Sequence, residues 1–307
     1  MKDIYGKRNI FYAISAAIIL LTVISAFVFH VRVDVQFKGG SIITYSYSGE
    51  LDIAKAQSVI EGSLGESVSI RDSVNQITNQ RNIIVTLAAA RALPTEALQS
   101  LTAALVSAFP DNSIVQEQVN AVDPSMGRSF LVKSAATVVL ASIFLLIYVA
   151  FRFKRIGGWP AGMTSILAVV LDVIAVFFAF IIFSMPIDDN FVAVVLTILG
   201  YALNDTIVVY DRIRENKKLM GSKATNEEIV NTSIRQTFRR SLIISASIML
   251  SMVAVSVIAV LYRVNSILSF SIPLMIGIAS GFYTSMFVAP TLWVTWRNRA
   301  AKKRATA

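Results

Sequence analysis

The chain has 307 residues, of which 55% are hydrophobic and 15% charged, and its formal net charge is +9. Soluble domains carry about 25% charged residues, so this composition indicates a membrane protein. Basic residues cluster at the ends of apolar segments, which we attribute to membrane topology and contact with anionic membrane lipids. We therefore expect no nucleic-acid partner.

The chain contains no cysteine and a single histidine, His30. These counts exclude disulfides, thiolate metal sites and histidine-based metal sites. We expect no metal, no cofactor and no enzymatic activity.

Six apolar stretches are long enough to cross a bilayer as helices. They cover residues 10–29, 130–151, 163–185, 191–210, 241–261 and 268–293. We interpret the first as a retained anchor, because no small-residue cleavage pattern follows it. Lys and Arg lie mainly on one side of the spans, which predicts that both termini face the cytoplasm.

The stretch between the first two spans has the composition of a soluble domain. Its pattern predicts a strand at 33–47, a helix at 52–63, strands at 67–73 and 81–87, a helix at 94–108 and a strand at 113–121. This order is typical of a ferredoxin-like α+β domain. Gly39 and Gly40 interrupt the first strand, where glycine permits an unusual backbone turn. A strand bulge and a joint that transmits motion are both compatible with that pair.

The predicted fold class is therefore an all-α membrane bundle of six transmembrane helices with one extracytoplasmic α+β domain. The expected parts are a cytoplasmic segment and first span (1–32), the external domain (33–122), the other five spans (123–296) and a basic tail (297–307). Residues 211–240 are expected to form a cytoplasmic loop. Within it Val230, Ile234 and Phe238 are spaced by four, which predicts an amphipathic helix at the membrane surface.

Asp205 lies inside the fourth apolar stretch, ~21 Å from its outer end at 1.5 Å per residue. A carboxylate at such depth costs about 2.5–3.5 kcal/mol, so it must face protein, water or a counter-charge. Asn204 and Thr206 flank it and offer hydrogen bonds. We interpret Asp205 as an ion or proton site; the alternative is a carboxylate that only holds two helices together.

Arg240 enters the fifth span from the cytoplasmic end and is the expected partner of Asp205, with Gln236 one turn earlier as a supporting polar residue. The alternative for such an arginine is contact with lipid phosphates. Asp172 is a second acid inside an apolar span. Two intramembrane acids and one arginine are the minimum for a proton relay, although a structural role for Asp172 remains open.

Alternating charges follow the fourth span, at Asp211, Arg212, Arg214 and Glu215. Solvated pairing on a helix surface is the default interpretation, and gating at the cytoplasmic mouth is the alternative. Gly277 and Gly281 in the sixth span are four residues apart, so a neighbouring helix can approach closely. Packing is the main interpretation of these glycines, and a flexible hinge is the other.

Several strings resemble the SecF subunits of the SecD/SecF family, which is similar to half of an RND-type transporter. They are Phe37-Lys38-Gly39-Gly40, Phe151-Arg152-Phe153, the run from Gly200 to Glu215, the run from Asn231 to Arg240, and Gly281 to Pro290. The resemblance implies a bacterial inner-membrane protein that pairs with SecD and assists the SecYEG translocon. The family often has His-Asp where this chain has Leu171-Asp172, so no histidine role is carried over.

The resemblance also implies that the pair uses the proton gradient to draw unfolded preproteins across the membrane, with Asp205 and Arg240 in the proton pathway. H⁺ is the expected coupling ion, and Na⁺ is the alternative. Two rival functions remain at this stage. One is half of an RND-like exporter of small molecules or lipids, and the other is a translocon assembly factor that transduces no energy.

Overall fold

The computed structural model describes residues 3–34, 37, 39–65, 68–74, 80–87, 93–122, 124–221, 224–262 and 264–305. Lys38, which belongs to one of the strings that resemble the SecD/SecF family, lies outside these residues. The described chain forms two compact units, one of residues 1–32, 136–260 and 264–307, and one of residues 33–135 with 261–263. Each unit is described by itself.

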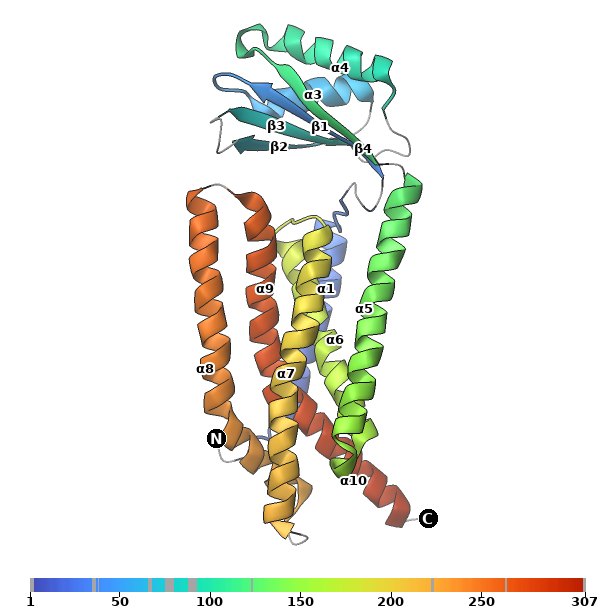
Figure 1. The fold of residues 1–307 in the computed structure, drawn as a ribbon, viewed down its shortest axis with the longest axis vertical. Helices are drawn as coiled ribbons and strands as arrows, with labels where there is room; N and C mark the ends of the chain where they lie inside the picture. Colours follow the sequence, from blue (N-terminus) through green and yellow to red (C-terminus); the bar gives the residue numbers. More distant parts are fainter. Residues whose placement is uncertain are drawn as a thin grey trace. The chain divides into compact units, whose positions relative to one another are not determined.

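Six helices are long and apolar enough to cross a membrane, as the sequence predicted. They are α1 (Arg8–Phe29), α5 (Pro124–Arg152), α6 (Gly158–Ile182), α7 (Asp189–Leu219), α8 (Asn226–Leu261) and a last span. The last span consists of α9 (Asn265–Tyr283), a π-helical turn (Thr284–Val288) and α10 (Ala289–Ala305). Figure 1 shows these helices side by side, with both chain termini at the same end of the bundle.

The core of the bundle lies between α6, α7 and the last span. About half of the apolar window of each is buried (50%, 50% and 56%), whereas only 17% of α1, 6% of α5 and 11% of α8 is buried. Val176, Ile198 and Trp293 are among the fully buried side chains of this core. The three peripheral helices therefore present apolar side chains to their surroundings, as expected for lipid or for another membrane protein.

The prediction of a loop at residues 211–240 is wrong in one respect, because most of this stretch is helical. Helix α7 continues to Leu219 and α8 already begins at Asn226, so no separate surface helix precedes the fifth span. Val230 and Ile234 are buried within this extension of α8. Charged residues end the apolar windows in this stretch but do not end the helices, since Glu, Lys and Arg are good helix formers.

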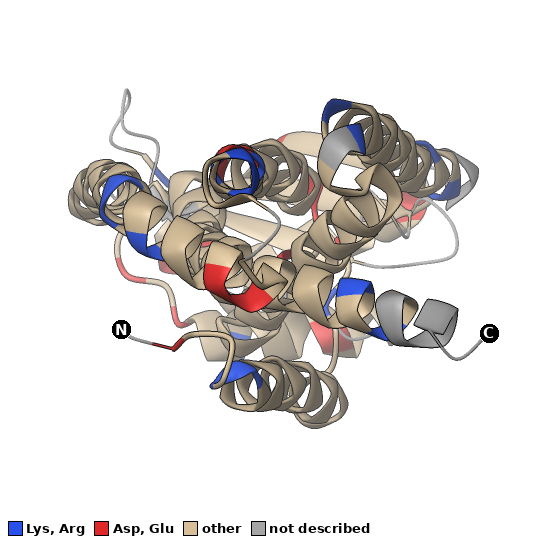
Figure 2. Cartoon of the chain, turned by 90° about the horizontal axis from the view of Figure 1, so that it is seen from below, with Lys and Arg blue, Asp and Glu red and all other residues tan. Residues whose placement is uncertain are grey.

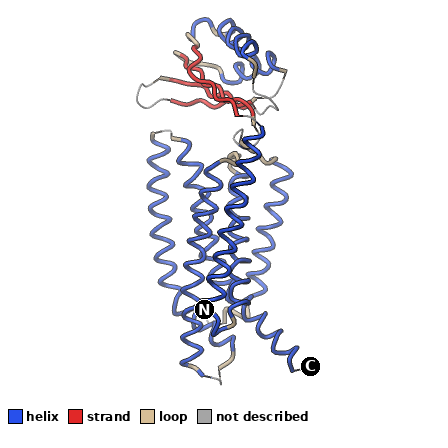
Figure 3. Tube along the Cα trace, turned by 45° about the vertical axis from the view of Figure 1, so that its right-hand side comes forward, coloured by secondary structure: helices blue, strands red, loops and turns tan. Residues whose placement is uncertain are grey.

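The second unit contains all the strands, which Figure 3 shows in red. Its elements are β1 (Gly40–Tyr47), α3 (Ile53–Leu64), β2 (Ser69–Val74), β3 (Arg81–Leu87), α4 (Thr95–Ala108) and β4 (Val115–Val122). This is the predicted order, and the sheet order is β2-β3-β1-β4 with antiparallel neighbours. The first strand is shorter than predicted, because its pairing begins only at Gly40.

The core of this unit lies between the sheet and its two helices. Ile43, Tyr45 and Val85 alternate along their strands and pack with Ile60 of α3 and Leu101 of α4. Helix α3 begins at an N-cap, where the Asp52 carboxylate accepts a hydrogen bond of 3.1 Å from the backbone N–H of Lys55. It ends at Gly65, whose φ of +68° is the left-handed conformation that favours glycine.

The glycine pair at the start of β1 has an unusual backbone. Gly39 and Gly40 have φ of +83° and +137°, which side chains rarely permit. The register of β1 with β4 shifts between Thr44 and Tyr45, so the described irregularity of the sheet lies away from the glycines. The role of the pair as a joint stays a prediction.

Candidate functional site

Asp205 lies on the inner face of α7 and is 2% exposed. The Ser241 hydroxyl of α8 is within hydrogen-bonding reach of the carboxylate. One carboxylate oxygen, Oδ2, is buried and has no hydrogen-bond partner in the described part of the chain. A buried carboxylate oxygen without a donor is costly, so this position is suited to accepting a proton or a cation.

Arg240 is on α8, as expected, and its charge acts on Asp205. The ion pairs among the described residues do not include this arginine, so the two groups interact beyond a 4.0 Å contact. The Arg240 side chain is exposed at the surface of α8 and lines a shallow hollow with Gln236, Arg239 and Ile243. The structure thus brings Asp205 and Arg240 near each other without joining them.

The three residues expected to support Asp205 are placed differently from one another. Thr206 is buried, and its hydroxyl contacts Ser285 at 2.8 Å. Asn204 is exposed on another face of α7. Gln236 accepts hydrogen bonds from Arg212 (2.6 Å) and from Asn216, so it belongs to the helix ends beyond the apolar windows.

Asp172 on α6 is fully buried, and its partners are two hydroxyls of the last span. Ser280 donates to Oδ1 at 2.6 Å, and the Thr284 hydroxyl lies 2.9 Å from both carboxylate oxygens. Among the described residues, no basic side chain forms an ion pair with Asp172. Asp172 and Asp205 therefore occupy different polar surroundings, and the sequence did not reveal the hydroxyl partners.

The π-helical turn lies between these two acids. Thr284 contacts Asp172, while its neighbour Ser285 donates to the Ala202 carbonyl at 3.0 Å and contacts Thr206 on α7. A π-turn inserts one extra residue and occurs often at functional sites. Here it directs two consecutive hydroxyls toward two different helices. A sequence signal was available, because these residues lie in the Gly281–Pro290 string.

Gly277 and Gly281 lie where other helices pack closely against α9. A Cβ on Gly277 would lie 2.7 Å from Ile198 and 2.8 Å from Val176. A Cβ on Gly281 would lie 3.3 Å from the Cβ of Ala202 and 3.8 Å from the Asp172 carboxylate. The absence of a side chain thus lets α9 approach α6 and α7 at the level of the buried acids.

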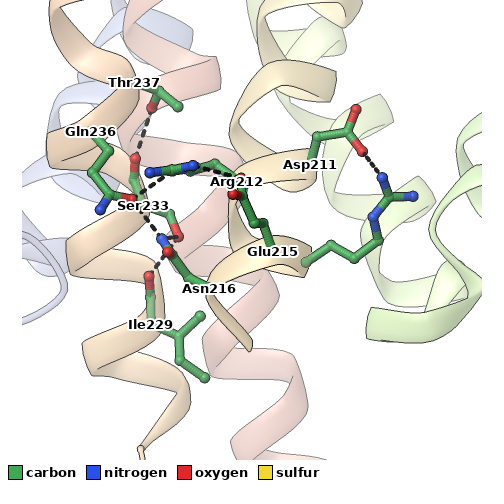
Figure 4. Close-up of polar contacts among 9 residues, drawn as sticks. Asp211, Arg212, Glu215, Asn216, Ile229, Ser233, Gln236 and Thr237 are labelled. Carbon is green, nitrogen blue, oxygen red and sulfur yellow. Dashed lines mark hydrogen bonds and ion pairs between the residues drawn. The ribbon is translucent and has the colours of Figure 1, made fainter. Parts of the chain in front are cut away.

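The charged residues after the apolar part of α7 form a network of ion pairs. Asp211 pairs with Arg152 of α5 at 3.2 Å and with Arg214 at 2.8 Å. Arg212 pairs with Glu215, and Figure 4 shows its guanidinium between Glu215 and Gln236. These side chains are about one-third to one-half exposed, so the pairs have the solvated character expected on a helix surface.

A buried polar contact made by the Tyr210 hydroxyl was not predicted from the sequence. Tyr210 of α7 is fully buried, and its hydroxyl lies 2.6 Å from the Thr164 hydroxyl of α6 and 3.3 Å from the Ala289 carbonyl. One side chain thereby connects three helices of the core. Tyrosine at the end of an apolar run gives no sign in sequence of which helices its hydroxyl will reach.

The bundle and its buried carboxylates define a multi-pass membrane protein with ionisable residues inside its helices. The family described as "Protein export membrane protein SecD/SecF, C-terminal" matches residues 100–299. The chain therefore belongs to the SecD/SecF family, as the sequence strings indicated.

Relatives match over nearly the whole chain. The protein translocase subunit SecF of Alicyclobacillus acidocaldarius is 31% identical over 98% of this chain and 94% of the relative. The protein translocase subunit SecDF of Bacillus subtilis is also 31% identical over 98% of this chain, which spans only 39% of that relative.

Two solved structures share the fold. The crystal structure of SecDF from Thermus, a translocon-associated membrane protein, matches with a TM-score of 0.77 and 26% identity. The match covers 96% of this chain and 38% of that one. A second SecDF structure, in a super-membrane-facing form, matches with a TM-score of 0.63 and 27% identity over 99% of this chain and 40% of the other.

Proposed function

We propose that this chain is an accessory subunit of the Sec preprotein translocase that uses the proton-motive force to promote late steps of export. Near-full-length similarity to translocase subunits supports the export role. The observation that carries the energy coupling is the buried Asp205 carboxylate, which has an oxygen with no donor among the described residues and an arginine nearby. The role is one of transport, without chemical catalysis.

In this mechanism a proton reaches Asp205 through a water-accessible gap between this subunit and its partner. Neutralising the carboxylate removes its attraction to Arg240, so α7 and α8 can shift relative to each other. Moving one charge through 100 mV supplies about 2.3 kcal/mol, which changes a two-state ratio by roughly fiftyfold when fully coupled. Asp172 would be the second acid of the pathway, and H⁺ the coupling ion, with Na⁺ as the alternative.

The proposed partner is SecD, and the two together would act on SecYEG and an unfolded preprotein. The SecDF relatives support this pairing, because the chain corresponds to less than half of each. The long exposed apolar faces of α1, α5 and α8 leave room for a second membrane subunit or for lipid.

We place the protein in the bacterial inner membrane with both termini in the cytoplasm. The support is the distribution of charge: Figure 2, seen from below, shows Lys and Arg on the helix ends around the termini. Arg8 begins α1, Arg152 ends α5, Lys217 lies in the last turn of α7 and Arg297 lies in α10. Cytoplasmic ends of membrane helices carry such an excess.

We further propose that the unit between α1 and α5 has the ferredoxin-like fold. Its support is the order β-α-β-β-α-β together with the sheet order β2-β3-β1-β4, in which β1 lies between two antiparallel neighbours. Two helices pack on the same core as the strands, as in a split βαβ arrangement.

The test is the Asp205→Asn variant, assembled with SecD and SecYEG in membrane vesicles. We expect preprotein release to lose its dependence on the proton gradient while the complex still assembles. Glu228→Gln, which removes an exposed carboxylate from α8, is the matched control and should keep the dependence. Full gradient dependence in Asp205→Asn would contradict the assignment.

The same assay separates the rival functions. An assembly factor would show no gradient response in the wild-type protein once the complex has formed. An exporter of small molecules or lipids would need large external domains, whereas the described part of the unit between α1 and α5 is one four-stranded sheet with two α-helices. Preprotein-independent export from the vesicles would favour that rival.

A further inference from the structure

The segment before α1 is attached to α8 through one side chain, that of Asn231. Its Oδ1 accepts hydrogen bonds from two consecutive backbone N–H groups, of Ile4 at 3.0 Å and of Tyr5 at 2.9 Å. Its Nδ2 donates to the Asp3 carboxylate at 3.1 Å, and the same carboxylate oxygen accepts from the Gly6 N–H at 2.8 Å. We call residues 3–6 the clip.

The clip is a folded structure. Ile4 and Tyr5 are 4% and 7% exposed and belong to the core of the bundle. The Tyr5 hydroxyl also lies 3.4 Å from Thr295 of α10. The Gly6 N–H and the Asn231 amide lower the pKa of Asp3 below its ordinary value of 3.8, so this carboxylate is ionised at neutral pH. The clip thus links α8 to α10 through the start of the chain.

Asn231 lies on the side of α8 that faces away from α7. At 100° per residue, Ser233 is about 200° from Asn231 around the helix, and Arg240 is about 180° from it. Ser233 contacts Asn216 of α7 at 2.9 Å. Around the helix axis, Arg240 is therefore within about 20° of Ser233, which contacts α7, while Asn231 lies on the opposite side of α8.

Burial contributes little to holding the rest of α8 in place. Leu250, Val257 and Val260 are 72%, 52% and 61% exposed, and only 11% of the apolar window of this helix is buried. Two hydroxyl pairs, Tyr201 with Ser245 and Ser256 with Ser271, connect that part to its neighbours. Near Asn231, α8 is held both by buried side chains, among them Val230 and Ile234, and by polar contacts on its two sides. The clip supplies the polar contacts on the side opposite α7.

We propose that the clip is a positioning device for α8, and that Asn231 is a positioning residue that keeps Arg240 directed toward the α7 face. The clip contacts α8 on the side opposite α7, so loss of these contacts lets the helix rotate or move away from α7. The consequence for Arg240 and the coupling rests on the proposed function, whereas the restraint on α8 does not.

Exchanging the side chains of Asp3 and Asn231 tests the proposed role of the clip. Asn231→Asp keeps an acceptor for the two backbone N–H groups but sets a second carboxylate against Asp3. Asp3→Asn retains a neutral hydrogen bond with Asn231 and should be mild. In the double variant Asp3→Asn/Asn231→Asp the new amide donates to the new carboxylate, so the attraction returns with the groups reversed. Glu228→Gln, exposed and one turn away, is the control for loss of one negative charge.

The readout is the distance between spin labels on α6 and α8 of the full chain. The sequence has no cysteine, so Leu167→Cys and Ile243→Cys, at positions 45% and 53% exposed, can be labelled directly. We expect a shifted or broader distance distribution in Asn231→Asp, and the wild-type distribution in the double variant and in Glu228→Gln. An unchanged distribution in Asn231→Asp, or no recovery in the double variant, would overturn the proposal.

Gradient-dependent preprotein release gives the second readout. Directly interacting residues couple strongly enough that Asn231→Asp should lower this release by roughly threefold or more, with recovery in the double variant. If the spin-label distances change as expected but preprotein release by the wild type does not depend on the gradient, the clip proposal is supported and the proposed function is contradicted. If release falls in Asn231→Asp without recovery in the double variant, the clip account fails.

Discussion

The Thr284 hydroxyl lies 2.9 Å from both oxygens of the buried Asp172 carboxylate, and this contact joins the last span to α6. We predict that Thr284→Val, which leaves Ser280 as the remaining hydroxyl donor described here, destabilises the protein by about 1–3 kcal/mol, because a buried polar group loses a partner. Thermal unfolding in detergent measures the effect. Thr284→Ser retains the hydroxyl and should remain close to the wild type; equal losses in the two variants would show that the methyl group contributes as much as the hydroxyl.

Asp172→Asn separates a role in proton transfer from a role in packing. The amide oxygen can still accept from Ser280, so we expect the unfolding temperature to change little. Gradient-dependent preprotein release should fall, because Asn cannot carry a proton as a carboxylate does. Normal release in this variant would assign Asp172 to helix packing alone.

Gly277→Ala should destabilise the bundle. The new Cβ would lie within 2.8 Å of Ile198 and Val176, and such overpacking costs about 1–3 kcal/mol, of which better helix propensity returns up to about 1 kcal/mol. Gly200→Ala on α7 is the matched control, since a Cβ there meets nothing within 4 Å. Thermal unfolding of the two variants should therefore move in opposite directions, or only the first should change.

The α+β unit between α1 and α5 should lose stability at high pH through Tyr47. Burial, followed by the hydrogen bond of 2.8 Å to Asp72, raises the pKa of Tyr47 to about 12 from its ordinary value of 10. The neutral phenol is favoured in the folded state, so its contribution is complete below pH 10 and is lost as pH rises from 10 to 12. The difference in tyrosinate absorbance between the wild type and Tyr47→Phe should show a transition near pH 12; a transition near pH 10 would contradict this environment.

The spans and the elements of the α+β unit could be predicted from the sequence because both depend on local patterns. Twenty apolar residues form a helix in a bilayer, and the strands of this domain alternate between buried and exposed positions. The start of β1 was predicted too early. Pairing with β4 determines where the strand begins, and the residues before Gly40 also have a sequence pattern typical of a strand.

The surroundings of the acids could not be predicted, because they depend on contacts between distant parts of the chain. Asp205 and Arg240 were paired from their depth in antiparallel helices, and the structure brings them near each other. The Ser280 and Thr284 partners of Asp172 lie more than one hundred residues away from it, and hydroxyls are common in membrane helices. Gln236 was assigned to Asp205 by its spacing, whereas the length of α7 places Arg212 and Asn216 within its reach.

The π-helical turn at Thr284–Val288 also determines the direction in which the side chains of α10 point around the helix axis. A π-turn contains one residue more than the α-helical path requires. Deleting one residue there would turn α10 by about 100° relative to α9. Trp293 and Val294, both fully buried, would then leave the core, so the chain cannot straighten this turn without repacking its last seventeen-residue helix.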